Sequence, residues 1–280
     1  MHADLTDTSL ARPRWARLPR DPRILQIAFL SSFFVFGALE RGFPAWQAPL
    51  LVAACCGTQW LCTRLLGLPS VGYLSPLITS LGLSILLRSD LVWVPILAGC
   101  VGIAGKFLVR FRGKHLFNPA ALGLGAAMLL TPHAWCSPSQ WGHGLMVAAW
   151  VAALGCAVAS RAFRADISLA FLGFWTLLKA GRVLLLGQRW AVLGHQLETG
   201  SLLLFAFFMI SDPKTTPERR GGRIALAAAV ALLGFHLQHG LFVQNALVWS
   251  LLSLSPLTAL FDAALPKETP CAPSSPALSA

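Results

Sequence analysis

The stretch "FFMISDPKTTPERRGGR", residues 207–223, closes an apolar segment with a proline-rich and strongly basic turn. The preceding residues 197–211 carry almost no charge, whereas Asp212, Pro213 and Pro217 follow at once, together with two threonines and three arginines. Proline fixes the backbone angle φ and removes an N–H donor, and an aspartate side chain accepts hydrogen bonds from nearby backbone N–H groups. The stretch therefore predicts an apolar helix that ends in a preorganised turn at one surface of the protein.

The composition of the chain indicates a membrane protein. Of its 280 residues, 56% are hydrophobic and only 12% are charged, and the mean hydropathy is +0.66. Soluble proteins cover their surface with charged and polar side chains, and so few charges cannot do that for a chain of this length. Because a membrane-spanning helix needs about 20 apolar residues, the chain has room for about eight to ten spans and little else.

Apolar runs, separated by charges and turn residues, give the expected layout. Two of them, 74–87 and 120–131, are shorter than a full crossing, which predicts helices that are short or broken within the membrane. We expect an all-α integral membrane protein with a ten-span domain (24–265), a basic cytoplasmic tail (1–23) and a disordered cytoplasmic tail (266–280). The ten runs are 24–39, 44–63, 74–87, 91–109, 120–131, 144–159, 167–187, 197–211, 224–239 and 243–261.

The basic residues predict the orientation. The net charge is +11, but these residues form short clusters between apolar runs, so we do not expect nucleic acid as a partner. With the N-terminus in the cytoplasm, sixteen basic residues fall on the cytoplasmic side and three, Arg41, Arg88 and Arg189, on the other. This asymmetry predicts a multi-pass protein of the plasma (inner) membrane, in contact with lipid, with both termini cytoplasmic. The sixteen are Arg12, Arg14, Arg17, Arg20, Arg23, Arg64, Arg110, Arg112, Lys114, Arg161, Arg164, Lys214, Arg219, Arg220, Arg223 and Lys267.

The two halves of this layout resemble each other. The stretches "LSPLITSLGLSILLRSD" (74–90) and "GSLLLFAFFMISDPKTT" (200–216) are both short, hydroxyl-bearing and marked by Ser-Asp near the end. The stretches "KHLFNPAALGLGAAMLLTP" (114–132) and "QHGLFVQNALVWSLLSLSP" (238–256) both place His, Phe and Asn before an apolar helix. Because five runs per half is an odd number, the halves must cross the bilayer in opposite directions. We expect inverted five-helix repeats with a site between them near the midplane. The repeats are residues 24–140 and 141–265.

Asn118 and Pro119 are the first candidate site residues. Asn is a favoured N-cap and Pro a favoured first helical residue. The positive end of a short helix that stops partway through the membrane is suited to an anion such as a phosphate, and Lys114 and His115 lie just before it. The alternative is a short helix packed against its neighbours, with the basic residues meeting lipid headgroups.

The opening stretch supplies the second group of candidates. We predict that Asp212, Thr215 and Thr216 form a rigid turn that faces the helix start at Asn118, with Lys214 left to meet an anionic cofactor or partner. The alternative is a topology anchor, in which only the basic charge matters.

Charged residues inside apolar runs form the third group. Lys179 and Arg182 lie three residues apart on one face of the seventh run, and charges inside spans are costly and often functional. Lysine can instead extend to the membrane surface, which is easier for Lys106. The sequence predicts no metal site, because His236 and His239 lack a third ligand. It also contains no Walker loop, dinucleotide-binding glycine motif or nucleophile elbow.

Three motifs carry a resemblance to a known family. The stretches "FFMISDPKTTP" (207–217), "KHLFNPAALGLGAAMLL" (114–130) and "SPLITSLGLSILL" (75–87) resemble the family shared by the D-type membrane component of Rnf electron transport complexes and the B-type membrane component of the sodium-pumping NADH:quinone oxidoreductase. The resemblance runs from about residue 74 to residue 265, and the N-terminal third matches poorly. It implies ten helices in inverted repeats, a urea-transporter-like fold, and a role in coupling electron transfer to cation movement beside other membrane subunits.

The resemblance also bears on the cofactor. The family attaches FMN covalently to the last Thr of an S/T-G-A-T motif in the outer loop after the fifth span. Here that loop is "TPHAWCSPSQWGHG" (131–144), which lacks the motif, and its one threonine, Thr131, precedes a proline. We therefore expect no covalent FMN, and any flavin, FMN or riboflavin, would be held non-covalently. Lys179 and Arg182 are not part of the family pattern, so the chain resembles a divergent member of the family, one that can stand alone.

Two other classes of function stay open from the sequence. A non-redox channel or transporter for small solutes can use the same urea-transporter-like fold. A membrane accessory protein of a biosynthetic pathway can use it to bind a partner or a lipid-like substrate.

The charge asymmetry generates a topology prediction. Reporter fusions at Gly42, Ser137 and His239 should report an external location, and fusions at Gly113 and Gly221 a cytoplasmic one, because positively charged loops stay inside. An external signal from the Gly221 fusion would contradict the predicted topology.

Overall fold

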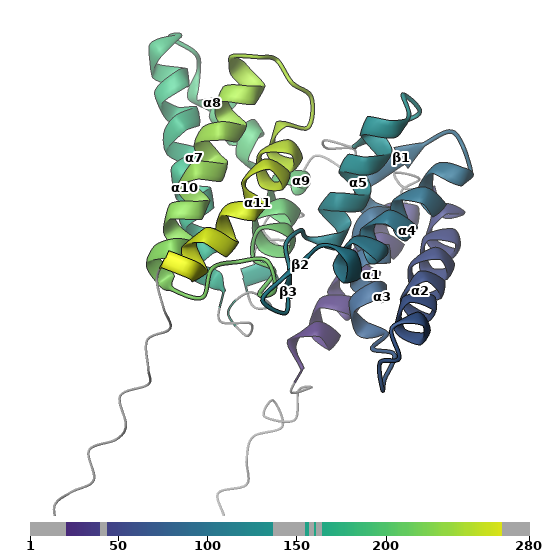
Figure 1. The fold of residues 1–280 in the computed structure, drawn as a ribbon. Coiled ribbons are helices and arrows are strands. Elements are labelled where there is room, and N and C mark those ends of the chain that lie inside the picture. Colours follow the sequence, from purple (N-terminus) through teal and green to yellow (C-terminus); the bar gives the residue numbers. More distant parts are fainter. Residues whose placement is uncertain (1–20, 40–43, 137–154, 157–159, 161–163, 265–280) are drawn as a thin grey trace, which may run out of the picture.

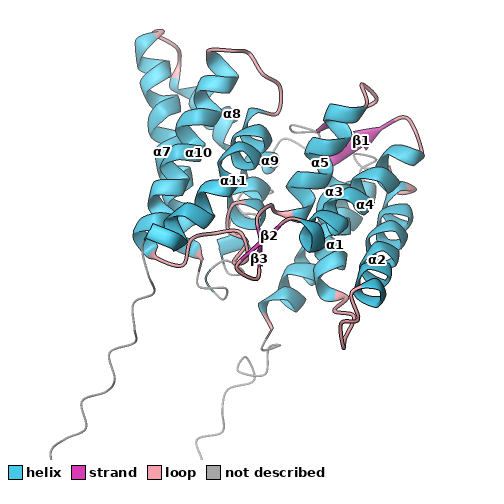
Figure 2. Ribbon diagram, in the orientation of Figure 1, coloured by secondary structure: helices cyan, strands magenta, loops and turns pink. Residues whose placement is uncertain are grey.

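The structure is a computed structural model that describes residues 21–39, 44–136, 155–156, 160 and 164–264, and these residues are mostly helical (Figure 1). The helices form two groups, one from the N-terminal half, coloured purple to teal, and one from the C-terminal half, coloured green to yellow. Figure 2 shows that only short strands interrupt them. The helical fold class expected from the sequence is confirmed in this coarse form.

The N-terminal group packs around α4. Helix α4 contacts α2 on one side and α5 on another, and α3 packs against α1 and α2. The helices of this group are α1 (Pro22–Leu39), α2 (Gln47–Leu65), α3 (Leu74–Leu86), α4 (Trp93–Leu108) and α5 (Pro119–Leu130).

The C-terminal group repeats this pattern around α10, which contacts α7 and α11 as α4 contacts α2 and α5. The two groups meet where α5 packs against α11. The elements of this group are α7 (Ala165–Leu185), α8 (Trp190–Leu197), α9 (Gly200–Leu204), the π-helical segment η2 (Phe205–Met209), α10 (Arg220–His239) and α11 (Ala246–Ala264).

Three helices in the described part of the chain, α7, α10 and α11, are long and apolar enough to cross a membrane. Helix α8 and the α9–η2 segment pass the same test together, but they are bent by 53° at their junction, as in a broken span or a re-entrant loop. Helices α1, α3, α4 and α5 are apolar but shorter. These lengths agree with a membrane protein, whereas the ten crossings in two repeats stay a prediction.

Each predicted apolar run overlaps a described helix except the sixth, 144–159, which lies almost wholly outside the described residues. The tails 1–20 and 265–280 also lie outside them. The structure corrects the eighth run, because α9 passes into η2, where the N–H of Ile210 bonds to the carbonyl of Phe205 at 3.0 Å. Such π-helical turns are frequent at functional sites. It also places α8 in a segment that the run pattern treats as loop.

Four short strands were missed by the sequence analysis. Strand β1 (Leu87–Ser89) pairs antiparallel with β4 (Ala134–Cys136), and β2 (Arg110–Phe111) pairs with β3 (Lys114–His115). Strands of two or three residues are too short to show the period-2 alternation on which a sequence prediction depends. The β2–β3 hairpin lies directly before α5 in the chain.

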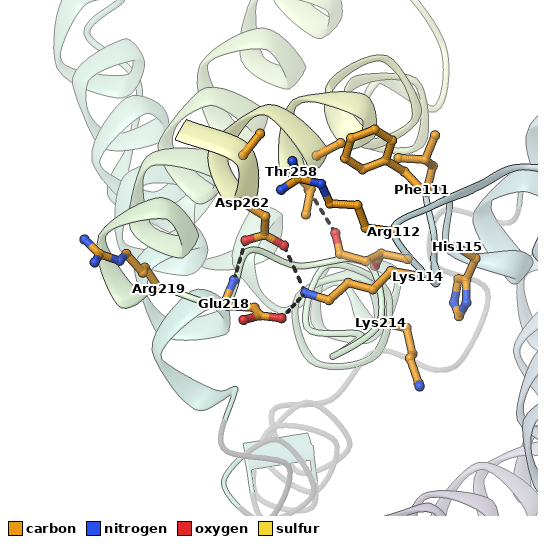
Figure 3. A pocket seen from close by; sticks show the side chains of 13 residues that line it. Phe111, Arg112, Lys114, His115, Lys214, Glu218, Arg219, Thr258 and Asp262 are labelled. Carbon is orange, nitrogen blue, oxygen red and sulfur yellow. Dashed lines mark hydrogen bonds and ion pairs between the residues drawn. The ribbon is translucent and has the colours of Figure 1, made fainter. Parts of the chain in front are cut away.

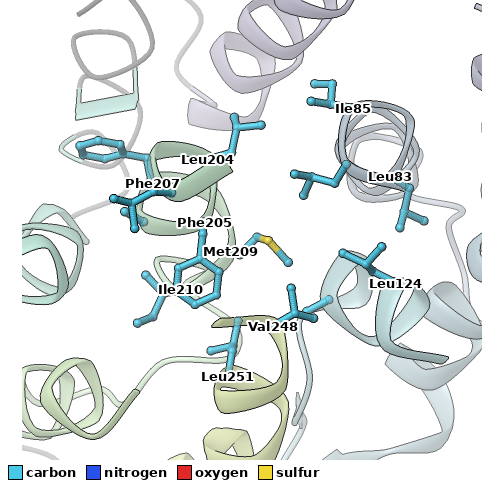
Figure 4. Packing of buried hydrophobic residues seen from close by; sticks show 14 of the residues in the cluster. Leu83, Ile85, Leu124, Leu204, Phe205, Phe207, Met209, Ile210, Val248 and Leu251 are labelled. Atoms are coloured by element: carbon cyan, nitrogen blue, oxygen red, sulfur yellow. The ribbon is translucent and has the colours of Figure 1, made fainter. Parts of the chain in front are cut away.

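The junction between the two helix groups is apolar. In Figure 4, Met209 points from η2 toward Leu83 of α3 and Leu124 of α5, and Val248 of α11 lies beside it. All four side chains are buried. The broken helix therefore packs between the two groups instead of lying at the edge of one.

Helices α4 and α5 approach each other through glycine. A Cβ atom at Gly123 would lie 2.3 Å from the carbonyl oxygen of Ala98, and one at Gly102 would lie 2.4 Å from that of Pro119. Small residues let helix backbones approach closely in an apolar environment, where packing rather than the hydrophobic effect holds helices together. No larger residue fits at this contact without moving a helix.

We predict that Gly123→Ala lowers the free energy of unfolding by about 1–3 kcal/mol, the usual cost of overpacking. Gly173→Ala in α7 is the matched control, because its Cβ would meet nothing within 4 Å, and it should leave stability unchanged or slightly raised. Thermal unfolding of the purified protein in detergent measures both. Equal melting temperatures for the two variants would contradict the close α4–α5 contact.

Candidate functional site

Asn118 begins α5 as the sequence predicted. Its side-chain oxygen accepts hydrogen bonds from the N–H groups of Ala120 (3.0 Å) and Ala121 (3.1 Å), and Pro119 is the first helical residue. The cap satisfies two N–H groups that have no partner within the helix. Its amide nitrogen is then available to bond outside α5.

The residues after η2 fold into the predicted turn. Asp212 accepts two backbone hydrogen bonds, through Oδ1 from the N–H of Lys214 (3.0 Å) and through its carbonyl from the N–H of Thr215 (3.1 Å). The hydroxyls of Thr215 (3.4 Å) and Thr216 (3.1 Å) donate to the same carbonyl, and Thr258 of α11 donates to the carbonyl of Thr215 (3.0 Å). Both threonines are buried, so their hydroxyl groups stabilise the turn.

The helix start and the turn meet, as predicted. The Asn118 amide nitrogen lies 3.3 Å from Asp212 Oδ2 and 3.4 Å from the carbonyl oxygen of Met209. His115 Nε2 lies 3.7 Å from the same Asp212 oxygen. One asparagine therefore joins the start of a short helix in the first half to the end of a broken helix in the second.

Lys114 binds carboxylates of the second half instead of standing open for an anion. Its ammonium lies 2.9 Å from both Glu218 and Asp262, and Asp262 also accepts from the backbone N–H of Glu218 at 2.9 Å. The sequence analysis missed both acidic residues. Lys114 and Asp262 are 148 residues apart, and no local pattern signals a pair at that separation.

A cavity of about 430 Å³ lies beside this ion pair (Figure 3). Lys114 points to Glu218 and Asp262, whereas Lys214 points away from them and is exposed. Two buried nitrogen atoms that face no hydrogen-bond partner among the described residues belong to this lining, Arg219 Nε and His115 Nε2. The lining residues are Phe111, Arg112, Lys114, His115, Leu116, Lys214, Thr215, Glu218, Arg219, Thr258, Ala259, Asp262 and Ala263.

A second charge cluster joins α7 to α10 at the end of the molecule where α7 begins. Asp166 lies 2.6 Å from Nη2 of Arg223 and also accepts from its Nε at 2.7 Å. Burial lowers the pKa of Arg164, and the nearby Arg223 lowers it further. Both arginine nitrogens contact the same oxygen, Asp166 Oδ2, whereas Oδ1 accepts from the backbone N–H of Ile167 at 3.0 Å.

Lys179 lies in a different place from the other candidates. It is only 3% exposed, and its ammonium contacts Gln238 Oε1 (2.9 Å) and His239 Nε2 (2.8 Å), 4.8 Å from the centre of the Trp175 ring. It lines a cavity of about 480 Å³, whereas Arg182, the other residue of the predicted pair, is not among the lining residues. The structure therefore places Lys179 away from the Asn118–Asp212 contact, at a cavity that Arg182 of the same helix does not line.

The first half contains a reciprocal pair. Lys106 of α4 donates to Gln59 of α2 at 2.6 Å, as Lys179 of α7 donates to Gln238 of α10. The lysine lies on α4 in the first half but on α7, the counterpart of α2, in the second half, and the glutamine lies on the other helix each time. Both pairs are near the C-terminal ends of their helices. A buried polar group needs a hydrogen-bond partner, but the sequence alone does not say which glutamine supplies it.

Comparison of the chain with protein-family models gives no match. Comparison with curated proteins also gives none. Within the described residues, no group of three or more His, Cys, Asp or Glu could hold a metal ion.

The turn generates a stability prediction. Asp212→Ala should lower the free energy of unfolding by about 1–3 kcal/mol, because it leaves the Lys214 N–H without its acceptor and the Asn118 amide with only the Met209 carbonyl. Lys214→Ala should change stability little, since its exposed side chain forms no hydrogen bond or ion pair with the described residues. Thermal unfolding in detergent measures both variants. The turn is only a topology anchor if Asp212→Ala has the melting temperature of the native protein. In that case only the removal of Arg219, Arg220 and Arg223 should change stability or activity.

Proposed function

We propose that the chain is a ten-span plasma (inner) membrane subunit of the type found in Rnf and sodium-pumping NADH:quinone oxidoreductase complexes, acting in redox-linked transport. Both termini would be cytoplasmic, and the partners would be lipid and other membrane subunits. The observation that carries the proposal is the contact of Asn118 with Asp212, where a short capped helix of one half meets a broken helix of the other. Transporters with inverted repeats place their sites where discontinuous helices meet between the halves.

The internal correspondence of the halves supports the repeat. Helices α2, α4 and α5 pack in the same order as α7, α10 and α11. The pairs Lys106–Gln59 and Lys179–Gln238 link corresponding helices. In an inverted repeat, corresponding positions lie on opposite sides of the membrane, which would place Lys106 toward the cytoplasm and Lys179 toward the outside.

The cavity beside Lys114 fits a non-covalently bound flavin. Arg219 and the exposed Lys214 supply positive charge for the phosphate of FMN, and His115, on the other side of the Lys114 ion pair in Figure 3, offers a separate polar contact. Phe111 offers an aromatic surface for the ring system. A bound flavin would supply one- and two-electron transfer. Thr131 in the opposite loop has its hydroxyl oxygen bonded by the N–H of His133 at 3.1 Å, and we expect no covalent FMN there.

A second candidate is a transporter or channel for small solutes without redox chemistry. The cavity around Lys179 favours it, because a buried charge inside a span commonly marks a substrate path, and Lys179 is outside the motifs that carry the family resemblance.

Flavin content tests the redox proposal. Protein purified from membranes should release FMN or riboflavin on denaturation. Lys214→Ala combined with Arg219→Ala should lower the flavin content about 10-fold, since a hydrogen bond to a charged group contributes about 1.5–3 kcal/mol. Arg64→Ala, which removes an exposed charge from the same predicted side, is the control and should retain flavin.

Two results would contradict this proposal. A native protein free of flavin, with normal stability, would favour the solute transporter or an accessory role. A fluorescent band on a denaturing gel after co-expression with a flavin transferase, absent from Thr131→Ala, would show covalent attachment.

A further inference from the structure

We propose that the cavity around Lys179 binds a small organic monocarboxylate with an apolar or aromatic body. The proposal is independent of the flavin and of the redox role, because it concerns a different cavity and different residues. It rests on the burial of Lys179, on the partners of its ammonium, and on the side chains that surround it.

The charge of Lys179 has no counter-ion in the described part of the chain. The residue is 3% exposed, and its described polar partners, Gln238 and His239, are neutral acceptors when the His239 ring accepts at Nε2. Lysine is almost never fully buried unless it is paired, and an isolated ammonium in an apolar environment is strongly unfavourable. An anionic ligand would supply the missing charge.

The number of donors favours a carboxylate over a phosphate. An ammonium has three N–H donors, and the two contacts with Gln238 and His239 leave one for a ligand. A single lysine matches a singly charged group, whereas phosphate is usually bound by arginine or by several donors together. Gln196 and Gln244 line the same cavity and can donate amide N–H groups to a second carboxylate oxygen.

The rest of the lining fits an apolar body. Trp175 and Phe205 form part of the wall, and Leu202 and Val248 add aliphatic surface. The volume of about 480 Å³ lies within the range of about 300–1,000 Å³ that is usual for small-molecule sites. Phe242, which is 79% exposed, lines the same cavity, so apolar surface continues from the buried wall to the outside.

The reciprocal pair shows what distinguishes this position. Lys106 is half-buried and contacts Gln59 and Ser75, yet it lines neither of the two cavities described above. A lysine–glutamine contact is therefore common to both halves, whereas Lys179 is in addition buried and lines the cavity of about 480 Å³. Lys106→Gln is a matched control for Lys179→Gln.

Calorimetry on the purified full chain in detergent tests the proposal, with 3-phenylpropanoate as the probe and its uncharged amide, 3-phenylpropanamide, as the comparison. The acid should bind the native protein about 10- to 100-fold more tightly than the amide, the range expected for one hydrogen bond to a charged group. Lys179→Gln should lose this preference, and Lys106→Gln should keep it.

Equal affinity of the native protein for the acid and the amide would overturn the proposal, and this result needs no variant to fold. Retention of the preference in Lys179→Gln, or its equal loss in Lys106→Gln, would also overturn it. A phosphate monoester of the same size that binds more tightly than the carboxylate would overturn it as well, by showing that the cavity recognises a phosphate, as in a lipid headgroup.

Discussion

The contact between Asn118 and Asp212 is the constraint on which the arrangement of the two helix groups depends. Asn118 caps α5 with its oxygen and reaches Asp212 and the Met209 carbonyl with its nitrogen. An apolar environment offers no water to unpaired backbone groups. The backbone N–H and C=O groups at the end of a short or bent helix must therefore find hydrogen-bond partners within the protein. Asn118 binds the start of α5 and the end of η2 at once, and so fixes the position of these two helix ends relative to each other.

The hydroxyl groups of the apolar segments follow the same rule. Ser211 donates to the carbonyl of Phe207, where η2 ends, and Ser84 donates to that of Ser80 near the end of α3. Thr258 binds the carbonyl of Thr215 and so links α11 to the turn. The hydroxyl side chains of these segments thus bond to backbone carbonyl groups near the ends of short or bent helices.

Charge is distributed unequally between the two ends of the molecule. At the end that carries the Asp212 turn, Lys114 and Arg223 are balanced by Glu218, Asp262 and Asp166. At the other end, Lys179 relies on neutral acceptors. The partners of an ion pair recover part of the cost of their desolvation, whereas a buried cation without a carboxylate recovers less. This difference makes the first end a structural junction with a cavity beside it and the second a candidate for an anionic ligand.

The sequence by itself determined the helical class, nearly every apolar segment, the cap at Asn118 and the turn at Asp212, because these depend on local composition and on neighbours within a few residues. Only the tertiary structure decided that Lys114 pairs with Asp262, that Lys179 lines a cavity that Arg182 does not line, and that the eighth run passes from α-helix into a π-helical segment. Pairings across 148 residues depend on which helices pack together. That packing is set by close contacts such as Gly102 with Gly123, which leave no periodic signal in the sequence.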